Sequence, residues 1–595
     1  MKPSFFDEFL AKNPHPQADV LIRILSSKTG LSTTGYPFIE ESAFGSFLQK
    51  VPHLFSNGLN LLHWLEKLSG SLENERTDEV ESFLRAIKVV KTVILTAVIT
   101  APTDLWLLRQ ILSTLKKAGV LEQLLSGDVL VLKEYAAKAA MSYKQLQADF
   151  AFLHSRGYLQ KELSRGSHKQ DSDVFSMAKT TVAQSVLTAI QVLSDDDLKA
   201  SWFHQFRDLF SGNVTEENRG KIASVLEFTA NPTSFEGWCA SWYEIELGFR
   251  IVPIVLALRS LQRTPLYKRG LNMQSIDLQS KNLPMVLPIL QLAGYVDHSG
   301  NITSLGERVF QRGPGPFGII YTYHAYMKHH EDLLYNREVS SWVSRGENVA
   351  ASQDANRKTF AMANDALDRF CAKYHYHYNL YIEHAVGQGE ATRQRLERSG
   401  EDQIQYFGAD LEDAAIDRAI GLQKDGALPK NMKFIRSADI GQPDLLIRAI
   451  LDQGYKTEGS IMIVGNGFHE VRQQTNEKMI GVLKAYCEAG IILLFTEESG
   501  LLDEDLLSTG WNTYHAGFRY VHAISGQGLR PAIDKEDSPV YSWAKCARLG
   551  GYEVLNEFCT RTRTIYPHPR KDGYNPAISV NYFCVPGKIS EMLRA

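Results

Sequence analysis

From Tyr374 onward the chain alternates short apolar runs with helix-period segments. The repeated switch between the two periods predicts strands joined by helical crossovers, as in a mostly parallel α/β sheet. The expected strands, in chain order, are 379–385, 403–410, 432–439, 460–464 and 490–497. Two further runs, 552–555 and 578–585, are expected to pair as a terminal antiparallel hairpin. The fold class is therefore α/β, with a doubly wound, Rossmann-like sheet in the C-terminal part.

Residues 1 to about 360 carry helix-period apolar patterning and few strand signals. In the run from Asp104 to Leu121 the apolar side chains share one face, and Asp104 is the expected N-cap. The longest apolar stretch near the N-terminus, Val89–Ala101, is interrupted by Lys91. It is shorter than the roughly 20 residues that span a bilayer, so it is expected to be a buried helix.

A local pattern occurs three times in this helical half, each time as an amphipathic helix closed by a glycine and followed by an apolar pair. The glycines are Gly119, Gly157 and Gly294. The third copy leads into a turn at Asp297–Asn301, and the order helix, strand, turn, strand or helix resembles a winged-helix module. Its helix, residues 282–290, has no basic side chain for a DNA groove, so a structural, dimerising or substrate-covering role is expected.

The order of these segments predicts four regions along the chain. A Gly-Pro break at Arg312–Gly318 precedes an aromatic helix that carries Tyr323 and His324, and the polar segment that begins at Ser344 is expected to be a linker. The regions are an N-terminal helical lid at 1–130, a helical and winged-helix-like region at 131–343, a linker at 344–366, and the α/β domain at 367–595.

Composition excludes several classes of protein. Lys plus Arg is 64 and Asp plus Glu is 68, a balance of −4, so no general surplus of cations favours nucleic acid. Six well-separated cysteines without a CxxC pair argue against a disulfide framework and a thiolate zinc site. With no apolar signal segment at the N-terminus, a cytoplasmic protein without membrane attachment is expected.

Glycines and acids follow the first three expected strands. The first strand runs into Val386-Gly387-Gln388-Gly389, a turn that lets a ligand approach backbone at a helix N-terminus. The second ends on Asp410, about 20 residues beyond that turn, where a carboxylate can hold both ribose hydroxyls. The third strand ends on Asp439, and a polar cluster follows the fourth.

This ordered set resembles the class I S-adenosylmethionine-dependent methyltransferases. The resemblance implies S-adenosylmethionine as cofactor, with Gly387 and Gly389 along its methionine part, Asp410 on the ribose, Asp439 beside the adenine and Glu383 on the ammonium. The full set of implied cofactor residues is Glu383, Gly387, Gln388, Gly389, Asp410, Leu411, Asp439, Ile440 and Asn466. The alternative, an ordinary nicotinamide-binding sheet, is disfavoured by Asp439 and by the terminal hairpin.

Two segments beyond the carboxyl ends of strands four and five carry the residues expected to do chemistry. One is Gly465–Glu470, which contains His469, and the other is Trp511–Pro531, which holds two histidines, a tyrosine, a glutamine and two arginines. Histidine nitrogens with an amide oxygen suit iron or manganese and leave positions open for substrate oxygens. A divalent metal would stabilise the charge that develops when a malonyl thioester enolises.

These segments, together with the long helical N-terminal half, resemble the metal-dependent C-methyltransferase domains in the loading modules of apratoxin-type and saxitoxin-type polyketide synthases. The resemblance implies methylation of a malonyl group on an acyl carrier protein, with mononuclear iron or manganese. The expected metal ligands are His469, His522 and Gln527, with His515 in reserve; Tyr514 and His515, with His469, are the catalytic candidates. Arg519 or Arg530 would pair with the malonyl carboxylate, and Tyr323 would help to cover the substrate.

Two other functions stay open at this point. One is a metal-independent O- or N-methyltransferase for a small molecule, whose winged-helix part supplies a dimer interface, so a homodimer is possible. The other is an S-adenosylmethionine-sensing regulator whose winged helices bind DNA. The lack of a basic face disfavours the regulator.

Overall fold

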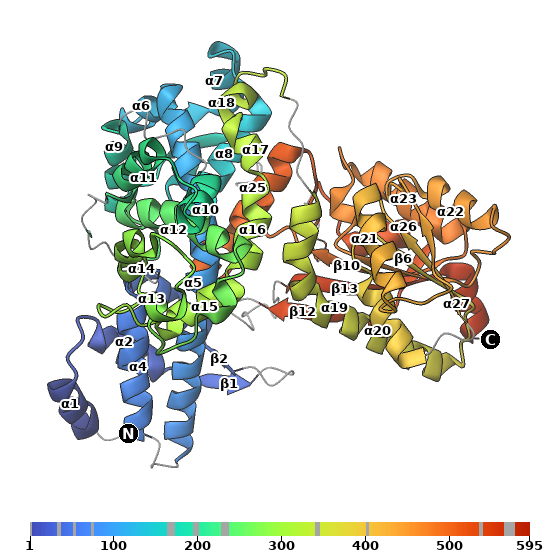
Figure 1. Ribbon diagram of the computed structural model, residues 1–595, viewed down its shortest axis with the longest axis horizontal. Helices are drawn as coiled ribbons and strands as arrows, with labels where there is room; N and C mark the ends of the chain where they lie inside the picture. The colour runs from blue at the N-terminus through green and yellow to red at the C-terminus, as the bar shows by residue number, and fades with distance from the viewer. Residues whose placement is uncertain are drawn as a thin grey trace. The chain divides into compact units, whose positions relative to one another are not determined.

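The computed structural model describes residues 3–594 except 32–36, 52–54, 73–76, 163–172, 194–201, 228–231, 233–236, 340–344, 400–403, 533, 535–538 and 565–576. The chain forms two compact units (Figure 1). The helical unit comprises 1–343, 503–521 and 565–575, and the sheet unit comprises 344–502, 522–564 and 576–595. Residues 503–521, which were expected in the C-terminal domain, therefore belong to the helical unit.

The sheet unit is built on one mixed sheet. Its strand order is β11-β13-β10-β9-β6-β7-β8, and β12 pairs with β13 beside β11. The strands β6 to β10 run parallel, whereas β13 is antiparallel to β10, β11 and β12. The strands are β6 (Leu380–His384), β7 (Gln405–Ala409), β8 (Lys433–Ile435), β9 (Ile461–Gly465), β10 (Ile492–Glu498), β11 (Tyr552–Val554), β12 (Thr560–Thr564) and β13 (Ala577–Pro586).

The expected α/β sheet is thus confirmed, and each of the seven expected strands has a counterpart. The pairing of β11 with β13 confirms the antiparallel terminal element, and β12 is a strand that the pattern did not predict. The polar Thr-Arg-Thr-Arg-Thr sequence of β12 hides it, because the apolar residues that reveal the other strands are missing.

Helices cover both faces of this sheet with separate apolar cores. On one face Ile382, Met462 and Tyr582 pack with residues of α22 (Pro443–Leu451), α23 (Asn476–Glu488) and α26 (Trp543–Leu549). On the other, Tyr381, Ile463 and Phe583 pack with residues of α19 (Arg345–Tyr374), α20 (Glu390–Ser399), α21 (Asp413–Lys424) and α27 (Gly587–Arg594). Neighbouring residues of one strand thus enter opposite cores, as the pleat requires.

Helix α19 changes the expected domain boundary. Residues 345–374 form one continuous helix, so most of the segment expected as a linker is helical. Phe360, Ala363 and Phe370 of this helix are buried in one of the two sheet cores. The sheet unit therefore takes part of its core from residues that precede Leu367.

The helical unit is organised around α5 (Asp78–Lys117), a 40-residue helix with a largely buried central half. Its other helices are α1 (Pro3–Lys12), α2 (Ala18–Leu25), α3 (Glu41–Lys50), α4 (Gly58–Leu72), α6 (Val120–Leu125), α7 (Leu132–Lys138), α8 (Tyr143–Ser155), α9 (Thr181–Gln191), α10 (Phe203–Ser211), α11 (Glu216–Leu226), α12 (Trp242–Ser260), α13 (Met273–Ile276), α14 (Leu287–Leu292), α15 (Ser304–Arg312), α16 (Pro314–Tyr321), α17 (His324–Lys328), α18 (His330–Leu334) and α24 (Asp503–Thr509). Helix α25 (His515–Ser525) begins in this unit. Among the described residues, no helix combines the length and apolar character needed to cross a bilayer.

Five short strands complete the helical unit. They are β1 (Thr29–Leu31), β2 (Pro37–Ile39), β3 (Leu130–Val131), β4 (Leu159–Lys161) and β5 (Val174–Met177). The first two form a ribbon, and the others form an antiparallel sheet of order β3-β5-β4.

The prediction that Asp104 caps a helix is wrong. Helix α5 starts at Asp78, where the Thr77 hydroxyl accepts the Val80 N–H, and continues past Pro102 to Lys117. Asp104 lies inside it, fully buried, with one carboxylate oxygen 3.5 Å from Nε of the buried Arg156. Val89–Ala101 is part of the same helix and confirms the expected buried segment.

The three glycines of the repeated pattern all adopt positive φ: +73° at Gly119, +88° at Gly157 and +70° at Gly294. The backbone beyond each glycine differs between the three copies. After Gly157 comes β4, and after Gly294 an isolated bridge joins Val296 to Ile302, but after Gly119 the chain continues as α6. The apolar pair expected to be extended in the first copy is therefore helical.

The Gly-Pro segment is also different from its prediction. Pro314 begins α16, which runs to Tyr321, so only Gly313 separates it from α15. Proline is tolerated in the first turn of a helix, because its missing N–H would have no partner there. The expected aromatic helix is divided between α16 and α17.

Candidate functional site

The carboxyl edge of the sheet contains a topological switch point between β6 and β9. Strands β7 and β8 follow on one side of β6, and β9 and β10 follow on the other. Ligands of open α/β sheets bind in the crevice outside such a reversal, because the crossover loops there turn away from each other. The glycine turn after β6 and the polar segment after β9 both lie at this edge.

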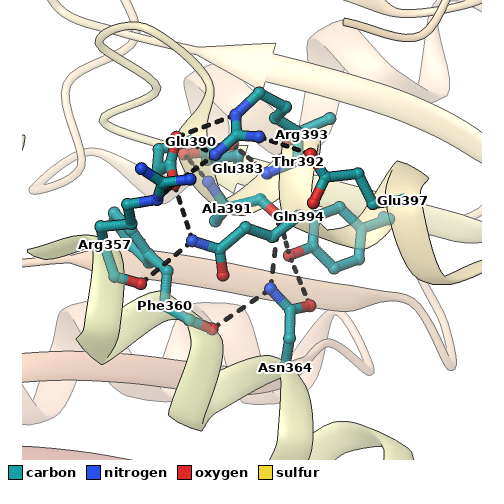
Figure 2. Close-up of polar contacts among 11 residues, drawn as sticks. Arg357, Phe360, Asn364, Glu383, Glu390, Ala391, Thr392, Arg393, Gln394 and Glu397 are labelled. Atoms are coloured by element: carbon teal, nitrogen blue, oxygen red, sulfur yellow. Dashed lines mark hydrogen bonds and ion pairs between the residues drawn. The ribbon is translucent and has the colours of Figure 1, made fainter.

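Glu383 fixes the helix that follows the glycine turn. Its two carboxylate oxygens accept the backbone N–H groups of Ala391 (3.2 Å) and Thr392 (2.7 Å), in the first turn of α20 (Figure 2). The side chain is buried. Burial raises the pKa of Glu383 to about 7, although the hydrogen bonds from Thr392 and Ala391 oppose the shift. Glu383 therefore holds the turn in place, and its expected contact with a cofactor ammonium stays a prediction.

The glycine turn itself requires glycine at Gly389. Its φ is +74°, and a Cβ there would lie 2.7 Å from a methyl carbon of Leu428. Gly387 has a φ of +52° and donates its N–H to Asp410 Oδ2 at 3.1 Å. The turn is thus tied to the end of β7, and Gln388 lies exposed between the two glycines.

The two acids after β7 and β8 are half-buried and bind backbone. Asp410 also accepts the N–H of Glu412 at 3.0 Å, while Asp439 accepts the N–H of Gly441 at 2.8 Å and the side-chain amide of Gln442 at 3.0 Å. Both therefore stand as expected at the carboxyl edge. The other expected cofactor residues follow the same strand ends: Leu411 is half-buried, Ile440 is buried, and Asn466 has a φ of +54°.

Helix α19 contributes a residue that the sequence analysis missed. Asn364 is fully buried and donates its amide to the carbonyl oxygens of Phe360 (3.2 Å) and Ala391 (3.3 Å), while its oxygen accepts the hydroxyl of Tyr381 at 3.4 Å (Figure 2). Ala391 is also bound by Glu383. Asn364 therefore joins α19, β6 and the start of α20 behind the glycine turn.

At the ends of β9 and β10, His469 and Glu497 form a buried pair. His469 lies in a 3₁₀ turn, Phe468–Glu470, after β9, and Glu497 is the penultimate residue of β10. His469 Nδ1 is 2.8 Å from Glu497 Oε2. The second carboxylate oxygen accepts the N–H groups of Phe468 (2.6 Å) and His469 (3.3 Å).

Electrostatics make this pair strongly basic. Burial alone would lower the pKa of His469, but the charges and hydrogen bonds of Glu497 and Glu470 outweigh it and raise the pKa to about 10. Burial raises the pKa of Glu497, while His469 and the two backbone N–H groups oppose that shift. The imidazolium form of His469 is therefore stabilised in a buried site.

His522 and Gln527, the other two expected metal ligands, lie next to His469. The rings of His469 and His522 are 5.1 Å apart at an angle of 64°. Gly528 donates its N–H to the carbonyl of His469 at 3.1 Å, and Gln527 donates its own to the carbonyl of His522 at 2.9 Å. The structure thus brings His469, His522 and Gln527 together, as expected.

The donor atoms of His469 and Gln527 are engaged with protein partners. His469 Nδ1 is bound to Glu497, and its Nε2 is 3.6 Å from a carboxylate oxygen of Glu470. The Gln527 amide nitrogen donates to Glu470, and its oxygen accepts the Ser525 hydroxyl at 2.8 Å. Within the described part of the chain, no three His, Cys, Asp or Glu side chains are grouped as metal ligands would be.

Four expected residues belong to the helical unit: Tyr514, His515, Arg519 and Tyr323. Arg519 forms an ion pair with Asp503 at 2.6 Å, and Lys161 binds the same carboxylate at 2.6 Å. Tyr514, His515 and Tyr323 are buried within that unit. Their parts in catalysis or substrate binding stay predictions.

Arg530 lies in the sheet unit and is buried among protein acceptors. Its guanidinium donates to Gln474 (3.2 Å), Asn476 (2.8 Å) and the carbonyl oxygens of Thr475 (2.7 Å) and Tyr541 (3.1 Å). It also lies over the ring of Trp543. This network favours a structural role, and binding of a substrate carboxylate by Arg530 stays a prediction.

Glu497 was placed in the fifth strand but given no function in advance. Its position at the carboxyl end of β10 is the feature of the sequence that could have marked Glu497 as a site residue. Glu497 is 28 residues from His469, and only the parallel pairing of β9 with β10 shows that they meet.

Solved structures resemble this chain, whereas family profiles and curated sequences do not. No protein-family profile matches the chain, and no curated protein sequence matches it. Among solved structures, a putative O-methyltransferase from Nostoc punctiforme is 9% identical, covering 56% of this chain and 94% of that one, with a TM-score of 0.38. The CurJ carbon methyltransferase is 12% identical over 89% and 98% of the two chains (TM-score 0.33), and PigF with SAH is 14% identical over 57% and 96% (TM-score 0.32). Similarity at this level supports no inference about activity.

Proposed function

We propose that this chain is an S-adenosylmethionine-dependent C-methyltransferase in which His469, oriented by Glu497, is the general base. The observation that carries the proposal is the 2.8 Å contact between these side chains at the same sheet edge as the glycine turn. A histidine paired with a buried carboxylate can abstract a proton from a carbon acid.

The residues after β6, β7 and β8 fit the proposed cofactor. Gly387 and Gly389 keep side chains away from the turn, and Asp410 stands beside it with a carboxylate that can accept ribose hydroxyls. Asp439 and Ile440 follow β8, where they would border the adenine. When bound, S-adenosylmethionine supplies an electrophilic methyl group.

His469 would take one proton from the acceptor carbon. Its Nδ1–H donates to Glu497, which leaves Nε2 as the base; the C–H bond breaks, an N–H bond forms at Nε2, and the electron pair stays on carbon for the new C–C bond. A conjugate acid with a pKa of about 10 matches carbon acids of similar pKa, such as carbons between two carbonyl groups. Glu497 would stabilise the imidazolium that forms.

We propose a malonyl-type acyl group as acceptor, carried by an acyl carrier protein or free as a small molecule in secondary metabolism. Such a carbon lies between two carbonyl groups, which delocalise the electron pair left when the base removes the proton. The proposed step does not use iron or manganese, because His469 is bound to Glu497, and Gln527 is bound to Glu470 and Ser525. Activity after chelation of metal distinguishes the metal-dependent subtype from the proposed reaction. The atom that carries the new methyl group distinguishes a C-methyltransferase from an O- or N-methyltransferase.

The helical unit is proposed to cover or present the acceptor. Part of this unit has the element order of a winged helix: α6, β3, α7, α8, β4 and β5. We propose that these elements form a winged-helix module, which covers the acceptor or joins two copies of the chain in a homodimer. A cytoplasmic location and the absence of nucleic-acid binding stay predictions that rest on the sequence.

The proposal is tested with methyl-labelled S-adenosylmethionine and a malonyl thioester, by mass spectrometry of the product. The expected result is a methyl group on the carbon between the carbonyls, lost in His469→Gln. Asp410→Ala should weaken cofactor binding in calorimetry while the protein stays folded. Methylation of an oxygen or nitrogen would reject the C-methyltransferase assignment, and unchanged cofactor affinity in Asp410→Ala would reject the cofactor site.

A further inference from the structure

A cavity of about 510 Å³ lies in the sheet unit and is lined by none of the residues assigned to the cofactor or to the His469–Glu497 pair. Its walls come from α26, from the segment before that helix, and from β11, β12 and β13. The volume is within the range of small-molecule sites, about 300–1,000 Å³. We name it the α26 cavity.

One part of the α26 cavity wall is apolar. It consists of the aliphatic side chains of Ala532, Ala544, Val554 and Val580, together with the ring of Tyr582. The Tyr582 ring is held in place by stacking on Phe495, with centroids 4.8 Å apart and planes at 24°. This surface would receive the apolar body of a ligand.

Charged side chains line another part of it. Arg548 and Arg561 are cationic, and Asp534 is the acid among the lining residues. Asp534 accepts the N–H of Ser542 at 2.9 Å, and its second oxygen lies 3.4 Å from Arg548 Nη2. Arg548 keeps about half of its side chain exposed, at 51%. Among the described lining residues the guanidinium groups outnumber the carboxylate, and a guanidinium can donate two parallel hydrogen bonds to an anionic carboxylate.

A buried hydroxyl adds a further polar group. The Tyr582 side chain is 5% exposed, and among the described residues its hydroxyl has no hydrogen-bond partner. Leaving a buried polar group unpaired is costly, so such groups are usually satisfied by water or a ligand. A ligand oxygen at this end of the cavity would supply that partner.

We propose that the α26 cavity binds a small organic monocarboxylate, with its carboxylate at Arg548 and Arg561 and its apolar chain against Ala544, Val554 and Tyr582. The site is separate from the proposed methyl-transfer site, since different residues line it. It therefore makes the protein a binder of a second small molecule, whether or not the proposed reaction is correct.

The test is calorimetry of the full-length protein with hexanoate, hexylamine and acetate as probes. Hexanoate should bind once per chain. Hexylamine, a cation, should bind about tenfold more weakly or worse, since a charge-assisted hydrogen bond contributes about 1.5–3 kcal/mol and 1.4 kcal/mol is tenfold. Acetate should also bind at least about tenfold more weakly, because it lacks the chain that packs on the apolar wall. Arg548→Gln should weaken hexanoate by a similar factor, and Ala544→Trp, which fills the cavity, should abolish its binding.

Two controls keep the inference falsifiable. Lys545→Gln removes a neighbouring cation of α26 that lies on the ring of Tyr541, 3.7 Å from its centroid, and is not part of the lining, so hexanoate binding should be unchanged. His469→Gln should also leave it unchanged, which separates this site from the proposed acceptor site. Absence of saturable hexanoate binding, equal binding of hexylamine, or an equal loss in Lys545→Gln would each overturn the proposal.

Discussion

The imidazole of His469 and the carboxylate of Glu497 meet at 2.8 Å in a buried site, although His469 follows β9 and Glu497 lies near the end of β10. Glu497 also binds the backbone N–H groups of Phe468 and His469, so the carboxylate holds both the ring and the turn that carries it. Such a carboxylate fixes the tautomer and the orientation of the imidazole it faces. His469 is therefore prepared to exchange a proton at Nε2.

Glu497→Gln is expected to lower turnover by about two to four orders of magnitude, the usual contribution of a positioned general base. The amide keeps the size of the side chain, but it removes the charge that stabilises the imidazolium. Labelled methyl transfer measures turnover, and calorimetry with the cofactor should show unchanged affinity. Glu488→Gln, which replaces an exposed acid of α23, is the matched control and should retain full activity. Equal activity in both variants would contradict the role of Glu497.

The pH dependence follows from the direction of the pKa shift of His469. A base must be unprotonated to act, and the pKa of its conjugate acid is raised to about 10, so at neutral pH only a small fraction is in the active form. We expect kcat/KM to rise about tenfold per pH unit from neutrality and to level off near pH 10. In Glu497→Gln the inflection should move down toward the ordinary histidine value of about 6.5. A flat profile in the native protein would argue against His469 as the base.

The same shift has an opposite effect on stability. Between the unfolded pKa of about 6.5 and the folded pKa of about 10, the folded protein binds more protons than the unfolded chain. The stabilising contribution of His469 is thus fully present below pH 6.5 and is lost as the pH rises through 10. Urea unfolding from pH 6 to 10 should show a smaller decline in unfolding free energy for His469→Gln than for the native protein. Parallel curves for the two proteins would show that His469 is not the titrating group.

Much of the sheet and its edge could be predicted from local sequence, and the reasons are physical. Buried parallel strands are short and apolar, so they are visible in the sequence as apolar runs. The turn at Gly389 needs a positive φ, so it is visible as a glycine. The pairing of His469 with Glu497 depends on which strands become neighbours, and that is set by the whole sheet. Helix α5 was misread because Pro102 and Asp104 resemble a helix start, while burial of Asp104 beside Arg156 is a long-range contact. Asn364 was missed for the same reason, since its partners lie on α20 and β6.

Asn364→Ala is expected to weaken cofactor binding more than it lowers turnover at saturating cofactor. The change removes the amide that holds Ala391 and the partner of the buried Tyr381 hydroxyl, at a cost of about 1–3 kcal/mol to stability. Calorimetry with S-adenosylmethionine measures the affinity, and thermal unfolding measures the stability. Gln453→Ala, which removes an exposed amide bound to the Ala449 carbonyl of the preceding helix α22, should change neither. A loss of stability without a change in affinity would make Asn364 purely structural.

Removal of metal separates the proposed base from a metal-dependent reaction. His469 Nδ1 is bound to Glu497 and Gln527 is bound to Glu470 and Ser525, so these atoms are engaged with protein partners. Protein treated with a chelator, and shown by elemental analysis to hold less than stoichiometric metal, is expected to keep its turnover. Readdition of Mn²⁺ or Fe²⁺ should not raise it. Loss of activity on chelation that either ion restores would mean that His469, His522 and Gln527 rearrange around a metal, and that this ion stabilises the enolate in place of the His469 base.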